Sequence, residues 1–301
     1  IMITDYPEDA TGEVVIPAQI DGKPVTSIGQ GAFTDCAALT SVSIPAGVTS
    51  ISGIGNPFVG CTSLTAIHVS PVNTAYASHE GVLLNALKTY VFKCPEAKQG
   101  SYSILEGVTN IGSMAFANCT RLTSVRIPAS VTSVLRSNSV GGSAFTGCSV
   151  LTSITVEPGN PSYASADGVL FNASMTDLIL CPMGKIGEYI IPATVNYLGS
   201  LAFEDCTGLT NVTIPDSITT MGDGAFKGCT GLTSVTIPGG IRSVDWGFAV
   251  VAVGVFRGCS GLTSVTLSEG LSEIWDAMFA GCTGLTSVTV PASVARIGGG
   301  A

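Results

Sequence analysis

The chain has 301 residues, of which 46% are hydrophobic and only 11% are charged, and its net charge is −9 with 12 Lys and Arg. This acidic balance argues against binding to nucleic acid or to an anionic membrane surface. The longest apolar run, residues 246–256, has 11 residues and contains two glycines, whereas a transmembrane helix needs about 20 apolar residues. We therefore expect no membrane insertion within this chain.

A short repeat begins within residues 1–33, which hold a degenerate copy of it. From Phe33 onward the motif Phe-x-x-Cys occurs eight times, and each Cys is followed three residues later by Leu-Thr and then by alternating Val, Ile or Leu. The eight pairs are Phe33/Cys36, Phe58/Cys61, Phe116/Cys119, Phe145/Cys148, Phe203/Cys206, Phe226/Cys229, Phe256/Cys259 and Phe279/Cys282. The shortest spacing between successive cysteines is 23 residues. A unit this short cannot bury its own apolar face, so we expect the repeats to stack as a solenoid.

The Leu-Thr-x-Val-x-Ile text predicts a short strand, because its Val and Ile alternate with small polar residues and so share one face. Pro follows in most copies and ends the strand, a Val-x-x-Ile segment supplies the opposite wall, and Phe fills the space between the walls. We expect one right-handed, β-rich superhelix over residues 1–301, with a parallel sheet on its concave side. The convex side should hold short turns or 3-10 or α segments.

Two matching segments interrupt the repeats. Residues 73–95 and 160–182 lie 87 residues apart and share Gly-Val-Leu, an Asn soon after it, and a final Cys-Pro. Their apolar residues alternate around a short polar turn, which predicts a β-hairpin inserted at each place.

The ten cysteines could be metal ligands, nucleophiles, disulfide partners or core residues. There is no Cys-x-x-Cys, and the two histidines, His68 and His79, stand alone, so a zinc site is disfavoured. Stacked identical side chains point in parallel, which suits a disulfide poorly. We interpret the eight repeat cysteines as small buried residues whose weak S–H donors face the turn backbone, and we expect no metal and no cofactor.

The text Phe-x-x-Cys-x-x-Leu-x-x-Val-x-Ile-Pro with Val-x-x-Ile-Gly resembles the BspA-like (Treponema-type) leucine-rich repeat, and the resemblance covers essentially the whole chain. The two inserts also look like that family, most clearly at Tyr163, 168–172 and 181–185. The resemblance implies a curved, leucine-rich-repeat solenoid on a bacterial surface, linked to adhesion, host-matrix binding or innate-immune contact, and not an enzyme. The family has no fixed binding residues that could be carried over.

A partner-binding site is expected where the repeat is broken. Extra residues occur at 52–57, 135–144 and 245–255, and insertions in solenoids form loops that often bind partners. We favour these insertions and the hairpins over the uniform Ser/Thr strands. The candidate residues are Trp246, Phe248, Arg136, Asn138, His68, Arg126 and Trp275. Trp246 and Trp275 could equally anchor a partner or cover the edge of the core.

We therefore expect a monomeric, non-catalytic, adhesin-like scaffold that binds a protein or extracellular-matrix ligand and no nucleic acid. It should be secreted or displayed at the cell surface, although the sequence shows no signal peptide or anchor. The alternative is a spacer or stalk within a larger surface protein, with no ligand of its own. An enzyme fits poorly because the strands offer no carboxylate pair, no Ser/His/Asp set and no phosphate loop.

Overall fold

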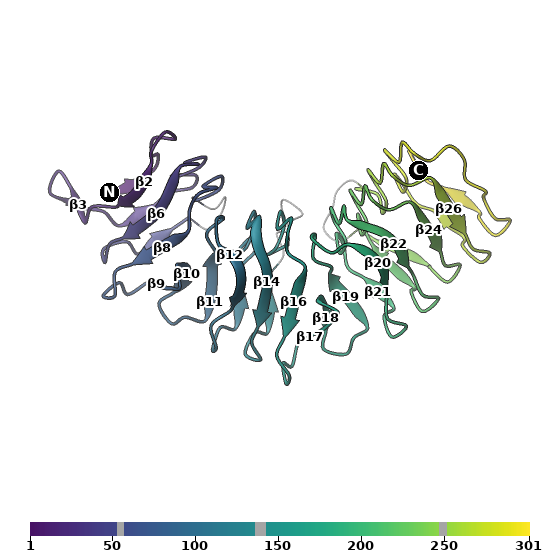
Figure 1. Ribbon diagram of the computed structural model, residues 1–301, viewed down its shortest axis with the longest axis horizontal. Helices are drawn as coiled ribbons and strands as arrows, with labels where there is room; N and C mark the ends of the chain where they lie inside the picture. The colour runs from purple at the N-terminus through teal and green to yellow at the C-terminus, as the bar shows by residue number, and fades with distance from the viewer. Residues whose placement is uncertain (53–56, 136–142, 247–251) are drawn as a thin grey trace. The chain divides into compact units, whose positions relative to one another are not determined.

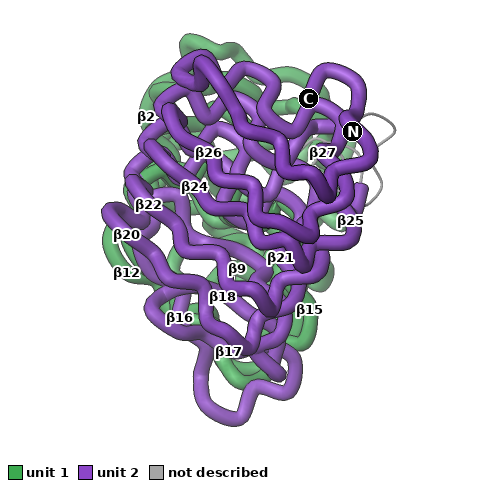
Figure 2. The backbone as a smooth tube through the Cα atoms, turned by 90° about the vertical axis from the view of Figure 1, so that its right-hand side faces the viewer, with its two compact units in different colours: residues 1–149 green, residues 150–301 purple. Residues whose placement is uncertain are grey.

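The computed structural model describes residues 1–52, 57–135, 143–246 and 252–301. The chain divides into two compact units, residues 1–149 and 150–301 (Figure 2). The described residues form strands and turns without a helix, so the strands are joined by turns and not by 3-10 or α segments. In particular, these residues include no helix long and apolar enough to span a bilayer. That residues 1–301 behave as one domain stays a prediction.

In unit 1, most repeats contribute a strand to one wall and a two-residue strand to a second wall (Figure 1). The first wall contains the Leu-Thr-x-Val-x-Ile strands and their degenerate counterparts: β2 (Gly12–Val15), β6 (Leu39–Ile44), β8 (Ala66–Val69), β12 (Gln99–Ser103) and β14 (Arg121–Ile127). Strands β2, β6 and β8 pair in parallel in that order, and β12 pairs in parallel with β14. The second wall contains β1 (Met2–Ile3), β5 (Ser27–Ile28), β7 (Ser50–Ile51), β13 (Asn110–Ile111) and β15 (Ser133–Val134). Strands β3 (Gln19–Ile20) and β4 (Lys23–Pro24) form a small antiparallel pair.

Unit 2 repeats this plan. Its first wall contains β16 (Ser153–Val156), β20 (Gly187–Ile190), β22 (Leu209–Thr213), β24 (Ser234–Ile237) and β26 (Ser264–Leu267). The last four form one parallel sheet in that order. Its second wall contains β21 (Tyr197–Leu198), β23 (Thr220–Gly222), β25 (Ser243–Asp245), β27 (Glu273–Ile274) and β28 (Arg296–Ile297). Unit 2 is thus the parallel, stacked β-solenoid that the repeats predict.

Both inserted hairpins are present, and each continues into a third strand. In unit 1, β9 (Tyr76–His79) pairs antiparallel with β10 (Val82–Asn85), and β10 pairs antiparallel with β11 (Tyr90–Lys93). Unit 2 has the same arrangement: β17 (Tyr163–Ala166) pairs antiparallel with β18 (Val169–Asn172), and β18 pairs antiparallel with β19 (Asp177–Leu180). The third strand of each insert then pairs in parallel with the second wall, β11 with β13 and β19 with β21. The inserts are therefore built into the solenoid and are not appended to it.

The core of unit 2 is a stack of phenylalanine rings. The centroids of Phe203, Phe226, Phe256 and Phe279 are separated in turn by 4.7, 5.0 and 5.8 Å, with interplanar angles of 14°, 5° and 12°. In unit 1 the pairs Phe33–Phe58 and Phe116–Phe145 stack at 5.4 and 5.1 Å. Tyr6 covers the first of these pairs, 5.2 Å from Phe33. The expectation that Phe fills the space between the walls is confirmed.

Each Phe-x-x-Cys turn contains a residue in the left-handed region immediately before the Cys. All eight of these residues have φ between 54° and 78°, and all are Asp, Asn or Gly: Asp35, Gly60, Asn118, Gly147, Asp205, Gly228, Gly258 and Gly281. These residue types tolerate left-handed backbone. Their amides join successive repeats, as in Asp205 N–H donating to the Lys227 carbonyl oxygen at 2.8 Å.

One buried ion pair distinguishes unit 1. Lys93 and Glu96 are each 2% exposed, and Lys93 Nζ lies 3.3 Å from Glu96 Oε1 and 2.9 Å from the Ala117 carbonyl oxygen. The positions 87 residues later hold Leu180 and Met183, and Leu180 occupies the same register beside its hairpin as Lys93. The same position in the fold therefore accepts either an ion pair or two apolar side chains.

We expect Phe226→Ala to lower the free energy of unfolding by about 3–5 kcal/mol, because the lost ring leaves a cavity between two stacked neighbours. Denaturant titration followed by circular dichroism measures this. The matched control is Thr236→Ala at an exposed strand position of the same repeat, which should change the free energy by less than about 0.5 kcal/mol. Equal midpoints for the two variants would show that the ring is not part of the core.

We expect Lys93→Leu and Glu96→Met to destabilise the chain by about 3–5 kcal/mol each, because each leaves its partner charged and buried. The double variant carries the pair found at positions 180 and 183, and it should recover most of the loss. A double-mutant cycle on denaturant midpoints measures this coupling. Additive losses in the double variant would contradict it.

Candidate binding surfaces

The repeat cysteines contribute hydrogen bonds between successive repeats. All ten cysteines are free and buried. Five of them lie with Sγ 3.0 to 3.1 Å from the carbonyl oxygen of the preceding repeat's Phe: Cys61, Cys148, Cys229, Cys259 and Cys282. Burial raises the pKa of Cys61 to about 12, so its thiol is protonated at neutral pH. This confirms the interpretation of the repeat cysteines as buried S–H donors.

The described residues contain no group of three or more His, Cys, Asp or Glu side chains that could hold a metal ion. Asp223 illustrates how the acidic groups are used. It is 3% exposed, and its carboxylate accepts hydrogen bonds from the backbone N–H groups of Val253 and Gly254 at 2.7 and 2.8 Å. The carboxylate thus fixes backbone at the end of an insertion.

The three insertions all leave their repeats at the same point of the fold. Each follows a second-wall strand, β7, β15 or β25, and precedes a Phe-x-x-Cys turn. The base of the third insertion is held on both sides, because Tyr197 Oη donates to Asp245 Oδ2 at 2.8 Å and Asp223 holds residues 253 and 254. At the first, the Ile51 N–H donates to Tyr76 Oη at 2.8 Å.

We define the first strand face as the outward side chains of β2, β6 and β8. Strand register places them in two rows of three. One row is Glu13, Ser41 and Ala66, and the other is Val15, Ser43 and His68. Glu13 is exposed, Val15 is 67% exposed, and Ser43 Oγ lies 3.4 Å from Glu13 Oε1.

The second strand face consists of the outward side chains of β20, β22, β24 and β26. Its first row is Glu188, Asn211, Ser234 and Ser264, and its second row is Ile190, Thr213, Thr236 and Thr266. Glu188 is exposed and Ile190 is 72% exposed. Each face therefore carries a carboxylate and an exposed aliphatic side chain on its first strand. Hydroxyl side chains make up most of the remaining rows on the second face and half of them on the first.

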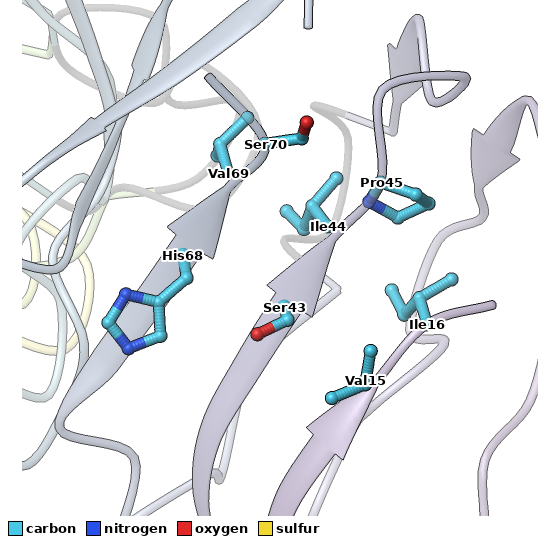
Figure 3. A pocket seen from close by; sticks show the side chains of 8 residues that line it. All are labelled: Val15, Ile16, Ser43, Ile44, Pro45, His68, Val69 and Ser70. Carbon is cyan, nitrogen blue, oxygen red and sulfur yellow. The ribbon is translucent and has the colours of Figure 1, made fainter. Parts of the chain in front are cut away.

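An open pocket of about 300 Å³ lies on the first strand face, at the carboxyl ends of its strands (Figure 3). It is lined by Val15, Ile16, Ser43, Ile44, Pro45, His68, Val69 and Ser70. Figure 3 shows Val15, Ser43 and His68 on three adjacent strands, with Ile16, Ile44 and Pro45 further along. The lining is mainly aliphatic, with the hydroxyl groups of Ser43 and Ser70 and the imidazole of His68 on it.

The described structure does not gather the sequence candidates into one site. His68 is exposed and lines the pocket, and Arg126 is exposed on β14, a strand of another sheet. Trp275 is 5% exposed within the core of unit 2, which favours a covering role over a partner contact. Trp246 is partly exposed. Arg136, Asn138 and Phe248 lie outside the described residues.

The two Glu–aliphatic pairs are hidden by the Ser/Thr consensus that most of the strands share. The signal was present in the sequence: residues 12–18 read GEVVIPA and residues 187–193 read GEYIIPA. Within both segments the Glu and the aliphatic residue are two positions apart and so face outward together.

The strands, turns and stacked repeats define a β-solenoid of the leucine-rich-repeat type. The family model described as "BspA type Leucine rich repeat region (6 copies)" matches residues 14–137, 85–178 and 181–301. The chain belongs to this BspA-type leucine-rich-repeat family, as its motifs predicted. No curated protein sequence matches the chain.

Solved structures of bacterial proteins share the fold. A leucine-rich repeat protein from Eubacterium ventriosum is 24% identical with a TM-score of 0.54, covering 97% of this chain and 82% of that one. A leucine rich cell surface protein from Faecalibacterium prausnitzii is 24% identical with a TM-score of 0.53, covering 95% and 87%. The pneumococcal vaccine antigen PcpA is 18% identical with a TM-score of 0.53, covering 98% and 86%. At these identities the likeness concerns the fold.

We expect most of the ten thiols to resist Ellman's reagent in the native chain at neutral pH and all ten to react after unfolding in guanidinium chloride. Burial blocks access of the reagent to the thiols, and at Cys61 it also keeps the thiol protonated by raising its pKa. Absorbance of the released chromophore counts them in each state. Four or more disulfides found by mass spectrometry of the unreduced chain would contradict this prediction.

Proposed function

We propose that this protein is a non-catalytic scaffold, secreted or displayed at a cell surface, that binds a protein or extracellular-matrix ligand as a monomer without a cofactor. The proposal rests on the positions at which the sequence departs from its repeat. Phe and Cys recur in all eight copies, while the three insertions leave at one equivalent point. The backbone beside the first and the third insertion is held by side-chain hydrogen bonds. In such an arrangement the surface loops can differ from repeat to repeat while the core residues stay the same.

Family membership supports this function and location. BspA-type repeats resemble those of bacterial surface proteins, and one solved structure with this fold is described as a cell surface protein and another as a vaccine antigen. Those descriptions belong to those two proteins, and we propose the same location here. We further propose that the insertion at 245–255, with Trp246 and Phe248, contributes contacts, since aromatic side chains dominate many interface energies.

A spacer role is the second candidate. The second strand face favours it, because past β20 its outward residues are Asn, Ser and Thr without a charged or large apolar side chain. A surface of that kind keeps a stalk soluble without selecting a partner.

The test compares the native chain with a variant in which one Asp replaces residues 246–253. This replacement shortens the segment to its length in the neighbouring repeat, where Asp223 alone separates Gly222 from Gly224. Both are passed over immobilised fibronectin, laminin, type I collagen and fibrinogen by surface plasmon resonance. We expect the native chain to bind at least one of these proteins and the variant to bind it at least about tenfold more weakly, with an unchanged denaturant midpoint. Unchanged binding with a lowered midpoint would make the insertion structural, and no binding to any protein favours the spacer.

A further inference from the structure

The two strand faces start on the same exposed pair of residues. Glu13 and Val15 on β2 and Glu188 and Ile190 on β20 occupy equivalent places, because each strand has the same register shift after its Gly and pairs in parallel with the next Leu-Thr strand. Val15 and Ile190 are 67% and 72% exposed. The pair therefore recurs once in each unit.

The fold does not require these side chains. Strand β12 has the same register shift and the same inward Tyr as β20, yet it carries Ser101 and Ser103 at the two outward positions. The inward residue between the pair is Val14 in β2 and Tyr189 in β20, so the core differs where the outward pair is kept. The same exposed pair thus recurs in both units at positions where core packing does not require it.

The charge of the pair favours a cationic partner. Neither Glu13 nor Glu188 forms an ion pair within the part of the chain that the structure describes. The second strand face carries no basic side chain on β20, β22, β24 or β26, and the whole chain has a net charge of −9. Complementary charges across an interface set partner choice and orientation.

The spacing of the pair favours an extended partner. The carboxylate and the aliphatic group are two residues apart on one strand, so they lie about 6.6 Å apart along it. Another extended chain carries alternate side chains at the same spacing. On the first strand face, the pocket of about 300 Å³ beside Val15 has room for an apolar side chain.

We propose that Glu13 with Val15, and Glu188 with Ile190, form two copies of one docking site for an extended, basic protein segment. That segment has Lys or Arg two residues away from an aliphatic or aromatic side chain. The cation contacts the carboxylate, and the apolar side chain packs on Val15 or Ile190. This inference rests on the proposed scaffold function and names the class of partner.

The experiment is an NMR titration of the isotope-labelled 301-residue chain with the peptide GSKTVTKTVSG. We expect amide shifts to change around residues 13–15 and 188–190 and to saturate at two peptides per chain. Control peptides replace each Lys with Glu or each Val with Thr, and both should bind at least about tenfold more weakly. Raising the salt concentration should weaken the native interaction.

The variants replace each pair with Ser, the residue that β12 carries at both outward positions. Glu13→Ser/Val15→Ser should abolish the shifts in unit 1 alone, and Glu188→Ser/Ile190→Ser those in unit 2 alone, while exposed Glu106→Gln should change neither. Denaturant midpoints confirm that all variants fold.

Equal binding of the Glu peptide, shifts elsewhere on the chain, no binding of the Lys peptide, or unchanged binding by the variants would each overturn the proposal. If the native chain and these variants then bind the same matrix protein equally, the scaffold function stands and only the docking site is wrong.

Discussion

The rise from one repeat to the next is the constraint on which the structure depends. Parallel strands pair about 4.8 Å apart, and the Phe rings of unit 2 stack with centroids 4.7 to 5.8 Å apart. Because rings and strands advance by nearly the same distance, one spacing satisfies the backbone hydrogen bonds and the ring contacts together. The cysteines connect the two, since Cys229 Sγ donates to the carbonyl oxygen of Phe203, the residue whose ring stacks next in line.

Neighbouring repeats cover the core of each repeat, so the outward side chains of the strands take no part in core packing. Unit 1 buries an ion pair where unit 2 has Leu180 and Met183, while the outward Glu and aliphatic residues of β2 and β20 match. Interior and surface therefore vary independently in this fold. That independence is what a binding scaffold needs, because a new surface can be tried without repacking the interior.

The sequence predicts the repeat, its strands and its stacked core, since each depends on text that recurs every 23 residues or more. It does not predict the third strand of each insert, because β11 and β19 pair with two-residue segments too short to show a period. The buried Lys93–Glu96 pair escapes for a different reason, since charged residues are normally expected outside. Of the site candidates, Trp275 proves to be a core residue, and the outward pairs at Glu13 and Glu188 occur in too few strands to enter a consensus.

The residue in left-handed backbone before each Cys restricts the order in which the repeats can follow one another. Every run of Phe-x-x-Cys repeats delimited by the two hairpin inserts opens with Asp or Asn at this position and continues with Gly. A Cβ on Gly60, Gly147 or Gly228 would overlap the side chain of Asp35, Asn118 or Asp205 in the repeat before it. Single repeats are therefore not interchangeable modules, because copying an Asp repeat behind itself would force two carboxylates together. Gene duplication that respects this rule must copy a whole run, and the 87-residue recurrence of the inserts with their following repeats has that form.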